Sequence, residues 1–453
     1  GTMTNSSYCS SYFCLRPWRA VTGVPSRTSS STFRLAVPGD ARAISALYRQ
    51  AYNPVNGGDA REHYPFPQFL DEECVAELLR TGVQRWFVAE IDHTIVGACG
   101  AVVNIGGPMD RIAEAFGLVI DARWQRQNFG TELFNTLCDS LVAENAAAFI
   151  MAETRTSHSG GWKVVRHCGF LPMGFEPFAH ATPAGSEAML MTGRVSPMAL
   201  AMRRRPGQAS ARVSRLSGRV LQELGCTPAE ALSEVPSALA PTAAACGPQT
   251  PRATGSAAAC VDGLLRPGGA NPEIHDEPWT GQLPEAARDM PGGAQGIIDL
   301  RRLEGHSPGS QRYERSLFVA TIDGRMVAHA QTSYDRCDRR LRIIELRAAT
   351  AGLAVALIGH VVQQRQGALR GAPFVVILDA RADQPGLHSA LEKIGFFPTV
   401  YYPALIQEAG ERCDAVQFTW LFGRDLKVSR DAADLSEWPL ACEIVAPITN
   451  GWH

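Results

Sequence analysis

The chain has 453 residues, of which 45% are hydrophobic and 19% are charged, a balance typical of folded proteins with two or three domains. Its 43 Lys and Arg residues nearly balance 45 Asp and Glu residues, for a net charge of −2, so overall charge does not favour a DNA-binding protein. No apolar run approaches the ~20 residues of a membrane helix. The 12 cysteines include no Cys-x-x-Cys pair, which predicts reduced thiols and no metal site of that type.

The first segment, residues 1–32, contains no Asp or Glu after Met3 and is rich in Ser and Thr. This composition predicts a disordered tail, and the scattered cysteines predict a reducing, cytoplasmic compartment. An organelle transit peptide has the same composition and is the alternative.

Ordered sequence begins at Thr32, and strand and helix patterns alternate from there to residue 225. Helical spacing of apolar residues predicts helices, and short apolar or alternating runs predict strands. The expected helices are 39–52, 130–144, a short one ending near 169, and 210–224. The expected strands are 86–90, 95–103, 115–120, 147–153, 171–178 and 188–193. This order predicts an α/β domain over residues 33–225, with the last helix as a C-terminal extension.

The next segment, residues 226–296, is dominated by Ala, Pro, Gly and Thr and is expected to be a linker between domains. A second region, 297–453, contains a faint repeat of the first. Phe87-Val88-Ala89 recurs as Phe318-Val319-Ala320, an offset of 318 − 87 = 231, and Gly169-Phe170 recurs as Gly395-Phe396, an offset of 395 − 169 = 226. Matches in the same order predict two copies of one fold, which could pack as a pseudo-dimer within the chain.

The segment most informative about function is an apolar strand that runs into a polar turn, which in turn opens a helix. It comprises Leu118, Val119 and Ile120, followed by Gln125, Arg126, Gln127, Asn128, Phe129, Gly130 and Thr131. Backbone N–H groups at such a helix start can bind a pyrophosphate, because they lie at the positive end of the helix dipole. An ordinary strand-to-helix loop is the alternative.

This segment resembles the pyrophosphate loop of the GNAT superfamily of acyl-CoA-dependent N-acyltransferases. That loop has Gln or Arg, two variable residues, Gly, one variable residue, and Gly or Ala. Here Gln125 and Gly130 match, while Asn128 replaces the first Gly; Asn is the residue that best tolerates a positive φ after Gly. The resemblance extends over residues 33 to about 195. It implies a mixed sheet flanked by helices, with acetyl-CoA or another acyl-CoA as co-substrate, an amino group as acceptor and no metal.

A narrower likeness points to amino-acid acetyltransferases of the β-lysine type. It rests on Tyr64-Pro65-Phe66-Pro67 and on the segment from Arg155 to Gly160. The likeness implies a small amine substrate that Tyr64, Phe66 and Arg155 would contact. Packing beneath a loop is the alternative for both aromatic residues.

The resemblance also implies catalytic roles. Glu114 would deprotonate the amine, directly or through water, and the backbone N–H of Val119 or its neighbour would stabilise the oxyanion. Many members carry a Tyr general acid where this chain has Val165, so His158 is the candidate acid. Without an evident nucleophile, direct attack in a ternary complex is expected.

The second copy is expected to be degenerate, because aligning Glu345 with Glu114 leaves no phosphate loop near Ala348. Several of its arginines could form a surface for an anionic partner, such as a carrier protein or tRNA: Arg336, Arg339, Arg340, Arg342 and Arg347. Two other functions stay open. One is a non-catalytic acyl-CoA-sensing protein, which Asn128 and Val165 favour. The other is an aminoacyl transferase with a tRNA-bound or carrier-bound donor, since GNAT folds elsewhere accept donors other than free acyl-CoA.

Overall fold

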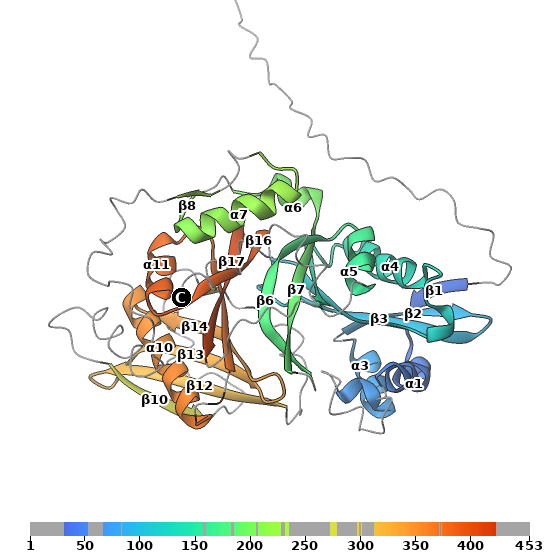
Figure 1. Ribbon diagram of the computed structural model, residues 1–453, viewed down its shortest axis with the longest axis horizontal. Helices are drawn as coiled ribbons and strands as arrows, with labels where there is room; N and C mark the ends of the chain where they lie inside the picture. Colours follow the sequence, from blue (N-terminus) through green and yellow to red (C-terminus); the bar gives the residue numbers. More distant parts are fainter. Residues whose placement is uncertain are drawn as a thin grey trace, which may run out of the picture.

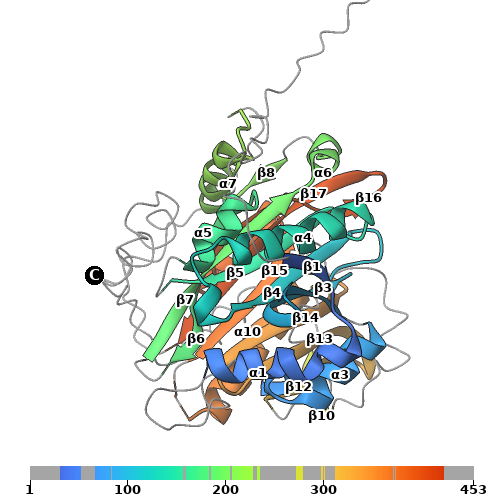
Figure 2. The same cartoon turned by 90° about the vertical axis from the view of Figure 1, so that its right-hand side faces the viewer.

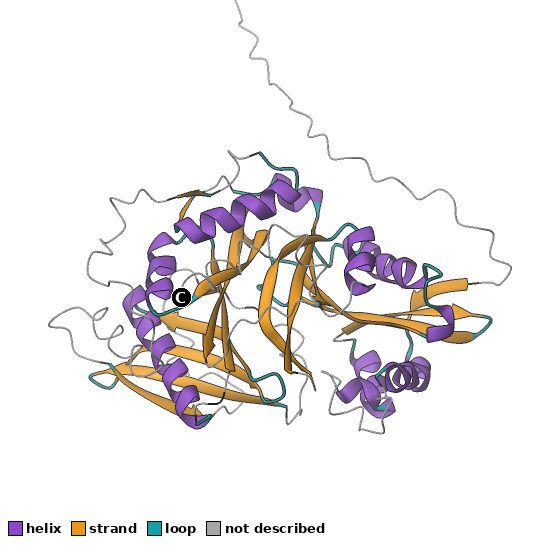
Figure 3. Ribbon diagram, in the orientation of Figure 1, coloured by secondary structure: helices purple, strands orange, loops and turns teal. Residues whose placement is uncertain are grey.

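The computed structural model describes residues 31–52, 67–82, 84–156, 160–182, 185–204, 207–227, 232–234, 272–278, 297–298, 312–370 and 374–422, together with Leu300 and Ala372. Its strands form a mixed sheet that runs continuously through the protein, with helices on both sides (Figures 1 and 3).

The first half of this sheet comes from residues 31–195, with strands in the order β1-β2-β3-β4-β5-β7-β6. Their bounds are β1 (Ser31–Leu35), β2 (Gln84–Ile91), β3 (Thr94–Val103), β4 (Ile112–Ile120), β5 (Phe149–Arg155), β6 (Leu171–Thr182) and β7 (Gly185–Val195). All neighbours are antiparallel except β4 and β5. A parallel pair needs a crossover connection, and the helix that follows β4 supplies it.

Helices cover both faces of the first half, as Figures 1 and 2 show. On one face lie α1 (Ala41–Ala51) and α3 (Glu72–Thr81), and on the other lie α4 (Phe129–Ala143) and α5 (Gly160–His167). The buried residues of α4 recur every three or four positions, as the helical period requires: Phe129, Leu133, Phe134, Leu137, Cys138 and Leu141. This layered packing places the start of α4 beside the end of β4.

The second half of the sheet repeats the strand order from the opposite edge, as β10-β12-β13-β14-β15-β17-β16. The bounds are β10 (Glu273–Pro278), β12 (Tyr313–Ile322), β13 (Arg325–Asp335), β14 (Arg340–Ala348), β15 (Phe374–Arg381), β16 (Phe397–Glu408) and β17 (Glu411–Phe422). Its helices are α10 (Ala351–Ala368) and α11 (Pro385–Lys393). A short strand, β11 (Ile297–Ile298), also pairs with β15.

Strand registers in the two halves correspond at constant offsets. Phe87 pairs with Cys99, and Phe318 pairs with Ala330, 231 residues later in both strands. Pro172 pairs with Thr192, and Pro398 pairs with Phe418, 226 residues later in both strands. The matching triplets of the sequence therefore occupy equivalent places in the two halves.

The halves join where β6 and β16 pair antiparallel, at Gly174 and Val400. A Cβ on Gly174 would lie 2.0 Å from the carbonyl oxygen of Thr399, and its φ is +150°, so only glycine allows this approach. Beyond it, α6 (Pro197–Ala201) and α7 (Ala211–Glu223) lead across the junction, and α7 packs on both joining strands. A two-stranded sheet of β8 (Gln208–Ala209) and β9 (Ser233–Glu234) lies beside α7.

The predicted elements of the first half are present, with ends shifted by a few residues. Two expectations need correction, and one helix was missed. Strand β1 begins at Ser31, inside the expected tail. Strand β10 lies inside the expected linker, 226–296, and is an ordered part of the sheet. Helix α3 was not predicted, although Asp71 caps its start by accepting a hydrogen bond from the N–H of Cys74.

Candidate functional site

The site expected from the sequence lies where β4 and β5 separate, a place called the fork below. The two strands pair in parallel only from Ile112 with Phe149 to Ala115 with Ala152. Strand β4 then continues to Ile120 and β5 to Arg155 without pairing to each other. Open α/β sheets bind ligands outside the carboxyl ends of such strands.

The loop after β4 is held in a defined shape by its own side chains. The Asp121 carboxylate accepts a hydrogen bond from the N–H of Arg123 at 2.9 Å, and the Arg123 guanidinium lowers the pKa of Asp121. The Gln125 amide donates to the carbonyl oxygen of Ile120 at 3.0 Å, and the Gln127 amide donates to that of Arg123 at 3.1 Å. These hydrogen bonds hold the loop in a defined shape.

Its backbone has the form of an anion-binding site. Arg126 has a φ of +60° and Asn128 a φ of +69°, and alternating hands of this kind turn successive N–H groups toward one point. Asn128 directly precedes α4, and its side chain does not cap the helix. Its left-handed backbone is the conformation that the Gly expected at this position would favour. Because the first N–H groups of a helix have no acceptor within it, the start of α4 offers donors to a phosphate.

Gly130 faces the end of β4. A Cβ there would lie 3.5 Å from Cγ1 of Ile120, 3.8 Å from Cδ2 of Leu118 and 3.9 Å from Cγ2 of Val164 in α5. These are ordinary van der Waals distances, so alanine fits at this position, whereas a longer side chain would project into the space between β4 and α5.

Glu114 lies at the base of the fork, paired with Val102 of β3 and Met151 of β5. Its side chain is buried, with 6% exposed. Side chains alternate along a strand, so Glu114 shares a face with Phe116, which packs on Phe69 and Trp86. Glu114 therefore points to the side of the sheet that carries α1 and α3.

A β-bulge separates Glu114 from Val119. Val119 pairs with Ala98 and Phe116 with Gly100, which leaves one more residue on β4 than on β3. The extra residue falls at Gly117–Leu118, so the bulge lies next to the expected oxyanion donor. Bulges re-aim backbone groups in this way.

The other predicted residues have mixed outcomes. Tyr64, Phe66 and His158 lie outside the described residues. Arg155 ends β5, where its guanidinium donates twice to the Glu187 carboxylate, at 2.8 and 2.9 Å, so it is partly committed to β7. Val165 is buried in α5.

Cys168 is not a candidate nucleophile. It is buried, its Sγ lies 3.5 Å from the carbonyl oxygen of Thr131, and burial raises the pKa of its thiol to about 12. A thiol protonated at neutral pH is a poor nucleophile.

The corresponding fork of the second half differs in three ways. Strands β14 and β15 pair only from Arg340 to Arg342. The short strand β11 pairs with β15 at Asp379 and Ala380 and also contacts β14. Eight residues separate β4 from α4, whereas only Ala349 and Thr350 separate β14 from α10. The Thr350 hydroxyl accepts a hydrogen bond from the N–H of Leu353, so this helix caps its own start.

The register also corrects the expected alignment of Glu345 with Glu114. Val119 pairs with Ala98 and Arg347 pairs with His329, so β14 follows β4 at an offset of 347 − 119 = 228. Glu114 therefore corresponds to Arg342, since 114 + 228 = 342. The expected basic surface is also wrong in part, because Arg340 and Arg342 are buried.

Both buried arginines contact a carboxylate from the first half. Glu176 of β6 accepts a hydrogen bond from Arg340 at 2.7 Å and from Arg342 at 3.1 Å. Arg342 also lies 3.2 Å from the Asp379 carboxylate. Arg342 and the Glu176 carboxylate thus occupy the place in the second half that Glu114 has in the first.

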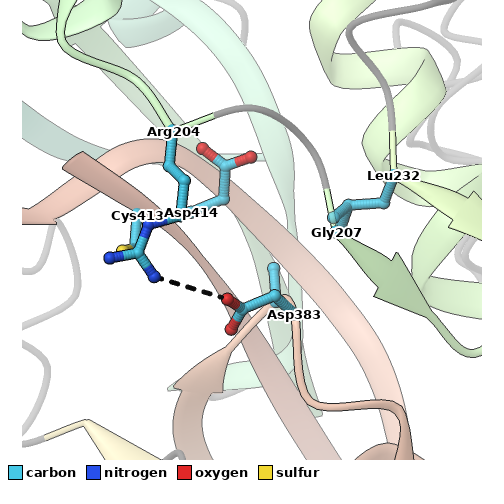
Figure 4. A pocket seen from close by; sticks show the side chains of 7 residues that line it. Arg204, Gly207, Leu232, Asp383, Cys413 and Asp414 are labelled. Carbon is cyan, nitrogen blue, oxygen red and sulfur yellow. Dashed lines mark ion pairs between the residues drawn. The ribbon is translucent and has the colours of Figure 1, made fainter. Parts of the chain in front are cut away.

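A small pocket at the junction of the halves has a different character (Figure 4). The cavity has a volume of about 20 Å³, enough for one or two water molecules. Arg204 points toward Asp383 across it, at 3.9 Å, and burial raises the pKa of Cys413 in its wall to about 11. These features indicate a structural ion-pair site.

Two further searches concern only the described part of the chain. No helix there is both long and apolar enough to cross a membrane. Nor do three or more His, Cys, Asp or Glu side chains gather there in a group that could hold a metal ion.

Comparison with known proteins identifies the first half. Residues 43–170 match the model of the acetyltransferase (GNAT) family, and this range contains the fork, the bulge and the loop. No curated protein sequence matches the chain.

Similar solved structures include ribosomal-protein-S5-alanine acetyltransferase from Vibrio fischeri, at 18% identity and a TM-score of 0.31, covering 38% of this chain and 98% of that one. Ribosomal-protein-S18-alanine N-acetyltransferase from Escherichia coli has 17% identity and a TM-score of 0.30, covering 37% and 94%. A spermidine N-acetyltransferase from Vibrio cholerae has 20% identity and a TM-score of 0.30, covering 36% and 93%. The family match over residues 43–170 gives the chain a GNAT acetyltransferase domain in that range, which supports an acyl-CoA-dependent N-acyltransferase.

Proposed function

We propose that the first half transfers an acetyl or related acyl group from acyl-CoA to the amino group of a small molecule. The observation that carries this proposal is the loop from Gln125 to Gly130, with two left-handed residues just before α4. The pyrophosphate of the co-substrate would accept hydrogen bonds from these N–H groups. Its acyl arm would then extend along the unpaired part of β4.

The reaction would proceed by direct attack in a ternary complex. The amine nitrogen forms a bond to the thioester carbon, and the carbonyl oxygen takes up the negative charge beside the N–H groups of the bulge. The C–S bond then breaks, and the thiolate leaves and takes a proton. Glu114 would accept the proton that the amine loses, directly or through water.

Two residues near the fork do not supply the proton that the departing thiolate takes. Val165 carries no titratable group, and the Cys168 thiol is buried beneath α4. We therefore keep His158 as the proposed acid, with solvent as the other source of the proton.

We further propose that residues 273–422 are a degenerate copy of the same fold, which does not bind acyl-CoA. The constant register offsets support the common fold. The missing loop, the self-capped α10 and the position of β11 beside β15 support the loss of binding. The arginine at the position of Glu114 supports the loss of catalysis.

This second half supports the base of the first fork. The N–H of Gln407 donates to the Asp110 carboxylate at 2.7 Å, and the fully buried Arg412 donates to the Asp110 carbonyl oxygen at 2.8 Å. Tyr402 packs edge-on against Phe149 of β5, with ring centroids 6.0 Å apart. The starts of β4 and β5 are thereby held from the second half.

Calorimetric titration with acetyl-CoA tests the binding part of the proposal. One site per chain is expected, and a stoichiometry of two would contradict the degenerate second copy. Gly130→Glu should abolish binding, because a carboxylate would repel the phosphates. Gly130→Ala is the matched control and should bind normally, since a Cβ fits there.

Release of free thiol from acetyl-CoA with a panel of small amines, including lysine, β-lysine and spermidine, tests the chemistry. An amine-dependent release is expected. Binding without release for any amine would favour the acyl-CoA-sensing protein. Activity that is lost after RNase treatment would favour an aminoacyl transferase with a tRNA-bound donor.

A further inference from the structure

A buried tyrosine of α1 contacts the bulge of β4. Tyr48 is fully buried, and its hydroxyl donates a hydrogen bond to the carbonyl oxygen of Gly117. The ring is held by aromatic neighbours, edge-on to Trp86 at 6.0 Å and tilted against Phe69 at 5.5 Å. The hydroxyl therefore has little freedom to move away from the bulge.

The bulge is shaped to receive this hydroxyl. Gly117 has a φ of +66°, and a Cβ there would lie 2.6 Å from the Tyr48 oxygen. The absence of a side chain at Gly117 thus serves both the left-handed conformation and the space for the hydroxyl. Glycine and tyrosine form a matched pair that neither the helix nor the strand pattern requires.

The hydrogen bond controls a peptide group of the proposed oxyanion site. Because a peptide is planar and trans, fixing the Gly117 carbonyl also fixes the N–H of Leu118, which belongs to the same peptide. The next N–H along the chain is that of Val119, whose direction follows from the conformation of Leu118. Burial raises the pKa of Tyr48 well above its ordinary value, so its hydroxyl remains protonated and a donor.

We infer that Tyr48 is a positioning residue for acyl transfer, and that it holds the bulge so that the N–H groups of Leu118 and Val119 meet the developing oxyanion. This inference rests on the proposed function. Tyr48 itself touches neither the acyl group nor the amine in this account. Its proposed effect passes through the Gly117 peptide.

Tyr48→Phe removes the hydroxyl and keeps the ring. We expect kcat for acetyl-CoA-dependent acylation to fall about 10-fold to 100-fold, somewhat less than the loss of a whole oxyanion donor. KM for acetyl-CoA should stay within about threefold, because the loop from Gln125 to Gly130 is untouched. Tyr334→Phe removes a buried tyrosine hydroxyl from β13 in the second half, so it is the matched control and should retain kcat.

A double-mutant cycle separates positioning from general destabilisation. Gly117→Ala places a Cβ against the hydroxyl and should lower kcat about as much as Tyr48→Phe does. In the Tyr48→Phe background the nearest atom is the ring Cζ, at 3.5 Å, so the alanine should cost less there. The cost of a left-handed alanine is common to both backgrounds and cancels. Should Tyr48→Phe not fold, Gly117→Ala still tests the same contact from the strand side.

The outcomes distinguish this inference from the proposed function. If the unmodified protein transfers no acyl group to any amine, the proposed function fails and the role of Tyr48 fails with it. If the protein is active and Tyr48→Phe keeps its kcat, only the role of Tyr48 is wrong. Equal losses of kcat and of acetyl-CoA binding, with additive effects in the cycle, would assign Tyr48 to folding alone.

Discussion

Glu176 offers a direct test of how the two halves are joined. Its carboxylate is fully buried, while the Arg340 and Arg342 side chains that it contacts are 10% and 2% exposed. Truncation in Glu176→Ala would leave two buried cations without this partner. Removing one member of a buried ion pair costs about 3 to 5 kcal/mol of unfolding free energy, and we expect a loss in that range.

Two further variants calibrate this value. Glu176→Gln keeps the shape and one acceptor but loses the charge, so it should cost about 1.5 to 3 kcal/mol, the contribution of a hydrogen bond to a charged group. Arg336→Ala removes an exposed ion pair of the second half, in which Arg336 and Glu314 lie 3.3 Å apart. It should cost less than about 1 kcal/mol.

Urea denaturation followed by far-UV circular dichroism measures all three variants, with the free-energy change taken from the midpoint and slope. Glu176→Ala should unfold at a clearly lower urea concentration than Arg336→Ala does. If its loss is below about 1 kcal/mol at an unchanged slope, the carboxylate does not hold the halves together as inferred.

Three other changes test the site and its surroundings. Glu114→Gln should lower kcat at neutral pH by about 10²- to 10⁴-fold with little change in acetyl-CoA affinity. The defect should shrink as pH approaches the pKa of the amine. A rate equal to that of the unmodified protein at every pH would refute the role of Glu114 as base. Cys168→Ala should retain most activity, because a thiol with a pKa of about 12 does not act as nucleophile; a loss of more than tenfold in a folded variant would contradict direct attack. The nearby His329 ring, at 3.6 Å, and a hydrogen bond from Arg347 lower the pKa of Glu345 to about 2, below the ~4.3 of an unfolded chain. Its stabilising contribution is therefore complete above pH ~4.3 and is lost as pH falls toward 2. Urea unfolding at pH 5 and pH 3 should therefore show a larger loss in the unmodified protein than in Glu345→Gln, and equal losses would refute this assignment.

Local patterns in the sequence were sufficient to predict most elements of the first half, α3 excepted, and the position of the loop. The loop from Gln125 to Gly130 was predictable because turn chemistry and the start of a helix depend on neighbouring residues. The same holds for α4, whose apolar residues repeat with the helical period. The triplets at Phe87 and Phe318 also indicated equivalent strands, which the register now places at matching positions.

Tertiary structure alone decided the contacts between distant segments. Tyr48 and Gly117 meet across 69 residues, and Glu176 reaches Arg342 across 166 residues; neither pair leaves a periodic signal in the sequence. Arg340 and Arg342 looked like a charged surface because sequence pattern does not reveal what covers a strand. Both contact Glu176 of β6, which reaches them from the first half. The offset of 228 between Glu114 and Arg342 likewise depends on strand register, which long-range pairing sets and short-range propensity does not.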